Sequence, residues 1–121
     1  MRIYKNGWFA KFARKERISD AALSDAIRRA EQGLIDADLG GGLLKQRVAR
    51  DGEGKSGGYR TLIFFRSGDR AIFVVGFAKS DKANLNALEL GALKKAAKEY
   101  LAFSQGKIDA LVEMESLTEV K

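Results

Sequence analysis

The chain has 121 residues, which is long enough for one domain with a single hydrophobic core. It carries 22 basic and 16 acidic residues, and the net charge of +6 favours an anionic or acidic partner. Histidine and cysteine are absent, which excludes disulfides, thiolate chemistry, the usual transition-metal ligands and any Ser-His-Asp arrangement. Since neither a signal peptide nor an apolar run of roughly 18 residues is present, we expect a cytoplasmic protein.

Two helices are predicted near the N-terminus. The first is indicated by an apolar stripe at helical spacing, which we assign to core packing rather than to base stacking: Trp8, Phe9, Phe12 and Ala13. The second begins after the N-cap Ser19 and ends near Gly33. Its apolar face consists of Leu23, Ile27, Ala30 and Leu34.

Three strands follow a turn region at residues 36–42. Residues 43–49 form the first, with Lys45 and Arg47 on one face. Residues 59–65 are apolar on both faces, which predicts a central strand covered by helices. A hairpin connection at residues 67–69 leads into a third strand at residues 72–78.

A further helix is predicted from the N-cap Asn86, which forms a capping box with Glu89, to about Phe103. Gln105 and Gly106 are expected to break it, and residues 110–117 fit either an edge strand or a short helix. We therefore predict an α+β fold in one domain covering residues 1–121, with a core of about residues 8–103 and a C-terminal extension at residues 105–121.

Basic residues gather on or beside the predicted strands, which suits a small sheet that binds a polyanion. They are Lys45, Arg47, Arg50, Lys55, Arg60 and Lys79. Residues 52–57 also match the G-x-G-x-x-G pattern of a dinucleotide site and resemble a P-loop. Both sites require a helix directly after the glycines, whereas here a strand is predicted, so we reject both.

Four segments together resemble the RelE/ParE toxin superfamily, and within it the HigB-like branch of RelE toxins. They are RVAR at 47–50, GKSGGYRT at 54–61, GFAK at 76–79 and NLN at 84–86. The resemblance covers roughly Trp8 to Phe103. It implies a small twisted antiparallel sheet packed by two N-terminal helices and one helix near the C-terminus, and it implies a ribosome-dependent endoribonuclease that cuts mRNA in the ribosomal A site.

The resemblance also suggests how RNA is cut without histidine, metal or cofactor. Lys55 is the candidate base for the 2′-hydroxyl, since neighbouring cations lower the pKa of a lysine. Arg60 would stabilise the phosphorane, and Lys79 would complete the phosphate site or assist the leaving group. The residues expected to bind the flanking RNA are Lys45, Arg47, Arg50, Phe77 and Lys82.

The implied partners are a cognate antitoxin, the ribosome and mRNA, and a toxin–antitoxin complex can bind operator DNA through the antitoxin. The antitoxin would cover the cationic cleft with acidic side chains or displace an element beside it. Two alternatives stay open: a ParE-type inhibitor of DNA gyrase, which shares the scaffold, and a non-catalytic basic RNA-binding module.

Overall fold

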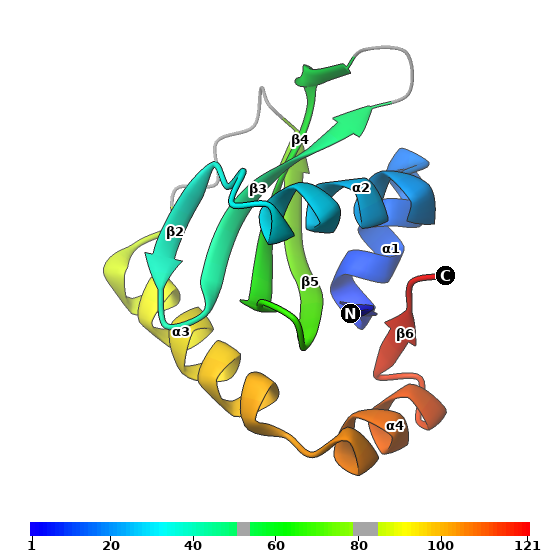
Figure 1. Ribbon diagram of the computed structural model, residues 1–121, viewed down its shortest axis with the longest axis vertical. Coiled ribbons are helices and arrows are strands. Elements are labelled where there is room, and N and C mark those ends of the chain that lie inside the picture. The colour runs from blue at the N-terminus through cyan, green and yellow to red at the C-terminus, as the bar shows by residue number, and fades with distance from the viewer. Residues whose placement is uncertain (51–53, 79–84) are drawn as a thin grey trace.

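The computed structural model describes residues 1–50, 54–78 and 85–121, and for residues 54–57 it describes the backbone alone. Within these residues, strands and helices follow one another as β1 (Arg2–Asn6), α1 (Gly7–Glu16), α2 (Asp20–Glu31), β2 (Ala37–Gly40), β3 (Leu43–Arg50), β4 (Gly54–Arg66), β5 (Arg70–Ala78), α3 (Ala87–Ala102), α4 (Gln105–Glu113) and β6 (Leu117–Glu119) (Figure 1). None of these helices is both long and apolar enough to cross a membrane.

The strands form one sheet in the order β2-β3-β4-β5-β1-β6, so the predicted α+β fold is confirmed. All neighbouring strands are antiparallel except β1 and β5, which run parallel. Sequence analysis missed β1, and it predicted a turn where β2 lies. Both strands are short, and β1 pairs with a strand more than sixty residues away, so no local hairpin signal marks it.

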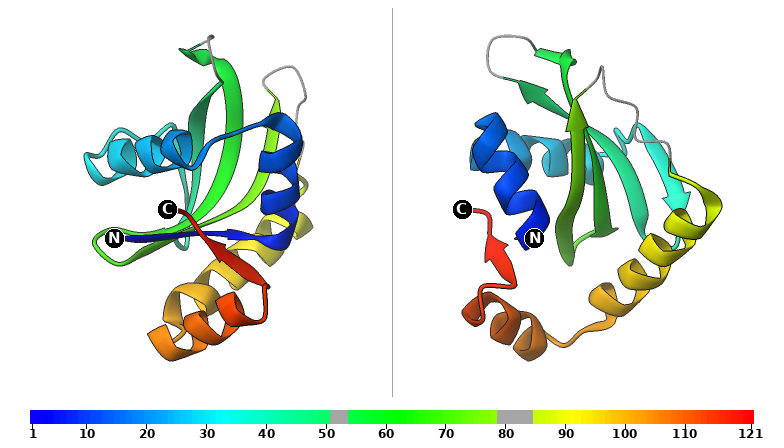
Figure 2. Two further views of the ribbon diagram at one scale, coloured as in Figure 1. Left: turned by 90° about the vertical axis from the view of Figure 1, so that its right-hand side faces the viewer. Right: turned by 180° about the vertical axis from the view of Figure 1, so that it is seen from behind.

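Helices cover both faces of the sheet, with α1 and α2 on one side and α3 on the other (Figure 2). On β4, Ile63 belongs to the core beneath α1 and α2, whereas Leu62 and Phe64 belong to the core beneath α3. The prediction of a central strand with two apolar faces is therefore confirmed. On the α3 side of β4, polar side chains therefore lie at both ends of this apolar pair, Arg60 before Leu62 and Arg66 after Phe64.

Helix caps fall where the sequence placed them at two of the helix starts. The Ser19 hydroxyl accepts a hydrogen bond from the backbone N–H of Ala22, and Asn86 and Glu89 form the predicted capping box. The predicted helix end near Phe103 is confirmed, since α3 ends at Ala102, but Gln105 and Gly106 do not break it, because both lie inside α4. Ser104 caps that new helix by accepting from the backbone N–H of Lys107, so a second helix starts at once.

The N-terminal apolar stripe is only partly in the core. Phe9 and Ala13 are buried as predicted, but Trp8 is 52% exposed and lies flat against Phe12, with ring centroids 5.4 Å apart. In α2, the face predicted to include Leu34 ends earlier, and Leu34 is 59% exposed. The helix stops at Glu31, so Leu34 no longer follows the helical face.

The C-terminal residues are part of the sheet rather than an appendage to it. β6 pairs with β1, and the two chain ends lie close together (Figure 1). Ile108 of α4 and Leu117 of β6 are buried in the same core as Tyr4 of β1. Residues 110–117, for which strand and helix were both open, form the end of α4, a turn and the first residue of β6.

Candidate nucleic-acid interface

Three strands place basic and aromatic side chains in a line on the α3 side of the sheet. Arg47 of β3 lies directly opposite Arg60 of β4, and Arg60 lies directly opposite Phe77 of β5. The ammonium of Lys45 reaches the same place, with its Nζ 5.9 Å from the centre of the Phe77 ring. We call Lys45, Arg47, Arg60 and Phe77 the basic row.

A bulge in the sheet brings Phe77 into this row. The pairing of β4 and β5 shifts by one residue between Leu62 and Ile63, because β5 has an additional residue there, Val74. Each residue of register reverses the face to which a strand's side chains point. Without this bulge Phe77 would point to the α1 and α2 side, away from Arg60.

Arg60 is the least satisfied cation of the basic row. Its Nη1 is buried, yet it has no hydrogen-bond partner, and no ion pair joins Arg60 to another described residue. It also faces Arg47 across the strands, and like charges directly opposite one another are destabilising. Since a buried charge without a partner costs free energy, this arrangement is suited to an anion that bridges the two guanidinium groups.

Neighbouring side chains hold Arg47 in position. Asp36 lies 3.3 Å from its Nε, and Arg29 of α2 donates from Nη2 to the Arg47 carbonyl oxygen at 2.7 Å. Gln46, which is fully buried, accepts from the backbone N–H of Asp36 and donates to the carbonyl oxygens of Ala26 and Leu34. Sequence reasoning missed these supports, because a buried Gln in a strand has no pattern of its own and Asp36 reads as a solvated loop acid.

The family model described as the RelE toxin of the RelE / RelB toxin-antitoxin system matches residues 1–120. The chain belongs to this family of RelE toxins. A search among curated proteins found no match. Membership supports a toxin role and a cognate antitoxin as partner, whereas the HigB-like branch remains a prediction.

The RelE toxin leaves no room for a side chain at Gly58 of β4, which faces the backbone of β3 beside the basic row. A Cβ added to Gly58 would lie 2.0 Å from the carbonyl oxygen of Val48, which real Cβ atoms essentially never do. Only glycine therefore fits at this point, next to the register shift between Val48 and Arg50. At least one glycine of the GKSGGYR segment, Gly58, is therefore required by the packing of the strands.

Arg50, predicted among the RNA-binding residues, does not lie with the basic row. Its guanidinium carbon is 5.7 Å from the centre of the Tyr59 ring, and Tyr59 belongs to the core beneath α1 and α2. Arg50 and Tyr59 line a separate cavity of about 260 Å³ with Glu16 and Arg17. The bulge after Val48 alters the alternation of β3, so spacing alone could not place Arg50.

The remaining predicted site residues lie at the limit of the described structure. Lys79 and Lys82 fall outside the described residues, and Lys55 lies on β4 where the backbone alone is described. Their catalytic and RNA-binding roles stay predictions. Among the described residues of the toxin, no cluster of acidic side chains is suited to hold a metal ion.

Proposed function

We propose that this RelE toxin is a ribosome-dependent endoribonuclease that cuts mRNA in the ribosomal A site and thereby inhibits translation. The observation that carries the proposal is the buried Nη1 of Arg60, which has no hydrogen-bond partner, on a residue paired with Arg47 on one side and Phe77 on the other. A phosphodiester would supply the missing acceptor, and an aromatic ring beside it would stack on a base.

In this proposal the 2′-hydroxyl oxygen attacks the adjacent phosphorus, and the bond to the leaving 5′-oxygen breaks. Lys55 takes the proton from the 2′-hydroxyl, and Lys79 gives a proton to the 5′-oxygen or completes the phosphate site. Arg60 stabilises the charge that develops on the phosphorane oxygens, since its planar guanidinium fits two of them at once. No metal or cofactor takes part, and Phe77 can stack but cannot transfer a proton.

Lys45 and Arg47 would hold the phosphates on either side of the scissile bond. Arg47 is neutralised by Asp36 in the free toxin, so an incoming phosphate competes with an exposed carboxylate, which is a weak competitor. Lys82 and Arg50 remain proposed contacts to more distant parts of the RNA. The toxin is proposed to act in the cytoplasm, where the ribosome is its working partner and the antitoxin silences it.

The test compares wild type with Arg60→Ala after induced expression, recording growth and mapping the ends of cellular transcripts. We expect growth arrest and codon-linked cuts with wild type and neither with Arg60→Ala. The matched control is Arg66→Ala, which removes an exposed arginine from the other end of β4, where it pairs with Asp69. This control should remain toxic.

Two results would overturn the proposal. Full toxicity of Arg60→Ala, with the same transcript cuts as wild type, would remove Arg60 from the reaction. Growth arrest with DNA damage and intact transcripts would instead favour a gyrase inhibitor of the ParE type. Circular dichroism of each purified variant separates loss of activity from loss of fold.

A further inference from the structure

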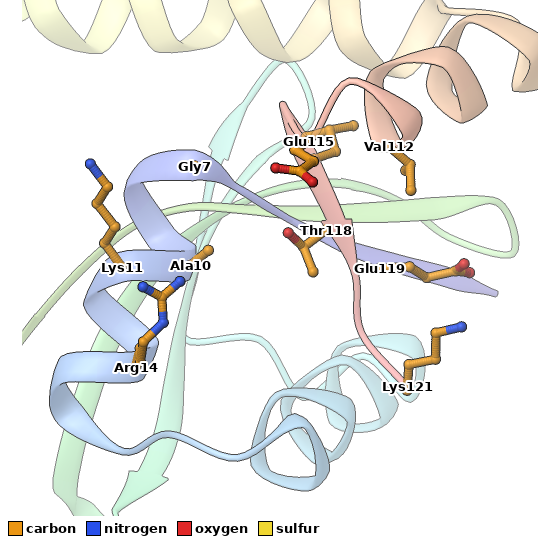
Figure 3. A pocket seen from close by; sticks show the side chains of 10 residues that line it. Gly7, Ala10, Lys11, Arg14, Val112, Glu115, Thr118, Glu119 and Lys121 are labelled. Atoms are coloured by element: carbon orange, nitrogen blue, oxygen red, sulfur yellow. The ribbon is translucent and has the colours of Figure 1, made fainter.

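A groove of about 630 Å³ lies between α1 and the C-terminal residues, away from the basic row (Figure 3). We call it the α1/β6 groove. One wall is α1, where Gly7 and Ala10 leave room because their side chains are small or absent. The other wall is formed by the end of α4 and by β6, including Val112 and Leu117. Apolar groups on both walls suit a peptide better than a bare phosphate chain.

The two cations that α1 contributes to this groove form no ion pair within the described structure. Lys11 and Arg14 belong to the α1 wall, with the Lys11 ammonium directed away from β6, and neither forms an ion pair with a described residue (Figure 3). On the opposite wall Glu119 points away from α1 and is held by Arg2, whose Nε lies 2.9 Å from its Oε2. Of the described residues that line the groove, Glu115 alone directs a carboxylate toward α1, so the groove as a whole favours an acidic occupant.

The groove also adjoins an open edge of the sheet. β6 is the last strand of the described sheet, so its outer edge has no neighbouring strand. The backbone N–H of Val120 donates to Ile3 of β1, and alternation along a strand then directs the N–H of Glu119 outward. An extended peptide can pair with such an edge while its side chains enter the adjacent groove.

We propose that the α1/β6 groove binds an extended, acid-rich segment of the cognate antitoxin. This rests on membership of the toxin family and not on the proposed nuclease activity. Glu115 in the wall would repel RNA phosphates, whereas one carboxylate is tolerated by a peptide whose acids meet Lys11 and Arg14. In the sheet, β5 and β1 separate β6 from β4, so an antitoxin held here has an anchor distinct from the basic row.

The test measures the affinity of the full-length cognate antitoxin for the purified full-length toxin by calorimetry. The groove variant is Lys11→Glu with Arg14→Glu, and the matched control is Lys95→Glu with Lys98→Glu, which changes the charge equally on the exposed side of α3. We expect the groove variant to bind roughly tenfold more weakly or worse, because two attractive charges become repulsive. The control should bind within about twofold of wild type.

A second variant tests shape without changing charge. Ala10→Phe fills the groove, and it should also weaken antitoxin binding while its melting temperature shows that the toxin still folds. Wild-type affinity in both groove variants would overturn the proposal. So would a groove variant that keeps its antitoxin affinity but loses ribosome binding, because that outcome assigns the groove to RNA.

The nuclease readout keeps the two proposals apart. Transcript cutting by the groove variants should match wild type in the absence of antitoxin, since neither Lys11 nor Arg14 belongs to the basic row. Suppose that wild-type toxin cuts no RNA, and that the variant Lys11→Glu with Arg14→Glu binds the antitoxin more weakly than wild type does. The nuclease proposal then fails and the groove proposal stands.

Discussion

Two arginines lie on the same face of the sheet, one at each end, and the hydrogen bonding of their Nη1 atoms differs. Arg70 at the start of β5 donates from Nη1 to the carbonyl oxygens of Tyr100 and Phe103, at 3.0 and 2.7 Å. It thereby ties the C-terminal end of α3 to the sheet. Arg60 at the other end has a buried Nη1 with no partner and a second arginine opposite.

The Arg70 guanidinium is not fully satisfied either, since its Nε is buried without a hydrogen-bond partner and lies 3.9 Å from Oδ1 of Asp69. The two arginines therefore differ at Nη1, which has two carbonyl acceptors in Arg70 and no partner in Arg60. At the Arg70 end, carbonyl oxygens left over at the end of a helix accept from a cation, which stabilises both. At the Arg60 end the described residues provide no such acceptor, so the folded state carries an uncompensated cost there. Such a cost is expected where a ligand completes the site.

The largest expected difference in the free energy of unfolding is between the alanine variants of these two arginines. Arg70→Ala leaves the Phe103 carbonyl oxygen without its donor and the Tyr100 carbonyl oxygen with the Phe103 N–H alone, and it should lower the free energy of unfolding by about 3 kcal/mol. Arg60→Ala removes an unpaired charge and should change it by no more than about 0.5 kcal/mol. Urea denaturation followed by circular dichroism measures both. The reverse order would show that Arg60 is structural and that the comparison is mistaken.

A smaller loss is expected from Gly58→Ala, which tests the strand geometry that the basic row requires. The added Cβ meets the Val48 carbonyl oxygen, so β3 and β4 must separate and the free energy of unfolding should fall by about 2 kcal/mol. The control is Gly91→Ala in α3, where a Cβ meets nothing within 4 Å. That substitution should stabilise the protein by about 0.5 kcal/mol, since Ala favours the helix. Equal effects of the two would contradict the close approach.

The contribution of Arg47 should appear in the salt dependence of RNA binding. Arg47→Ala removes one phosphate contact, so the slope of log K against log salt should become shallower by about one. Anisotropy titrations with a labelled single-stranded RNA at several salt concentrations measure this slope. Arg66→Ala, outside the basic row, should leave it unchanged. An unchanged slope for Arg47→Ala would place RNA elsewhere on the toxin.

The smallest effect concerns Arg2, a third arginine, which is exposed and paired. Its hydrogen bonds to Glu119 hold the pKa of that carboxyl below its ordinary value of 4.5. A lowered pKa in the folded state stabilises above pH 4.5, and this stabilisation is lost as the pH falls further. Glu119→Gln should therefore lower stability by less than about 1 kcal/mol at neutral pH and by almost nothing at low pH. Melting curves from pH 3 to 7 would show it, and a constant difference across that range would contradict it.

The sequence predicted those parts of the fold that have local signals. Ser19 and Asn86 mark helix starts by capping chemistry, and the apolar residues on both faces of β4 mark a central strand. β1 escaped because its pairing with β5 is distant in sequence, and the start of α4 escaped because Ser104 caps a helix whose first residues include a glycine. These elements depend on contacts with parts of the chain that are distant in sequence, and such contacts cannot be predicted from a local sequence pattern.

The candidate site was predictable to a similar degree. Alternation along β3 placed Lys45 and Arg47 together, the clustering of basic residues on the predicted strands included Arg60, and the resemblance added Phe77 and the role of Arg60. It did not show that Phe77 needs a bulge at Val74 to reach Arg60, or that another bulge directs Arg50 toward Tyr59. Insertions of a single residue reverse every later side chain, so register cannot be read from composition or spacing.

The central claim is tested most directly by single-turnover cleavage of a defined mRNA on purified ribosomes. Wild-type toxin and Arg66→Ala should cut the A-site codon at similar rates and leave the same mRNA intact when ribosomes are omitted. Arg60→Ala should cut at least about a hundredfold more slowly, the loss typical of removing one transition-state donor. Equal rates for Arg60→Ala and wild type would contradict the account.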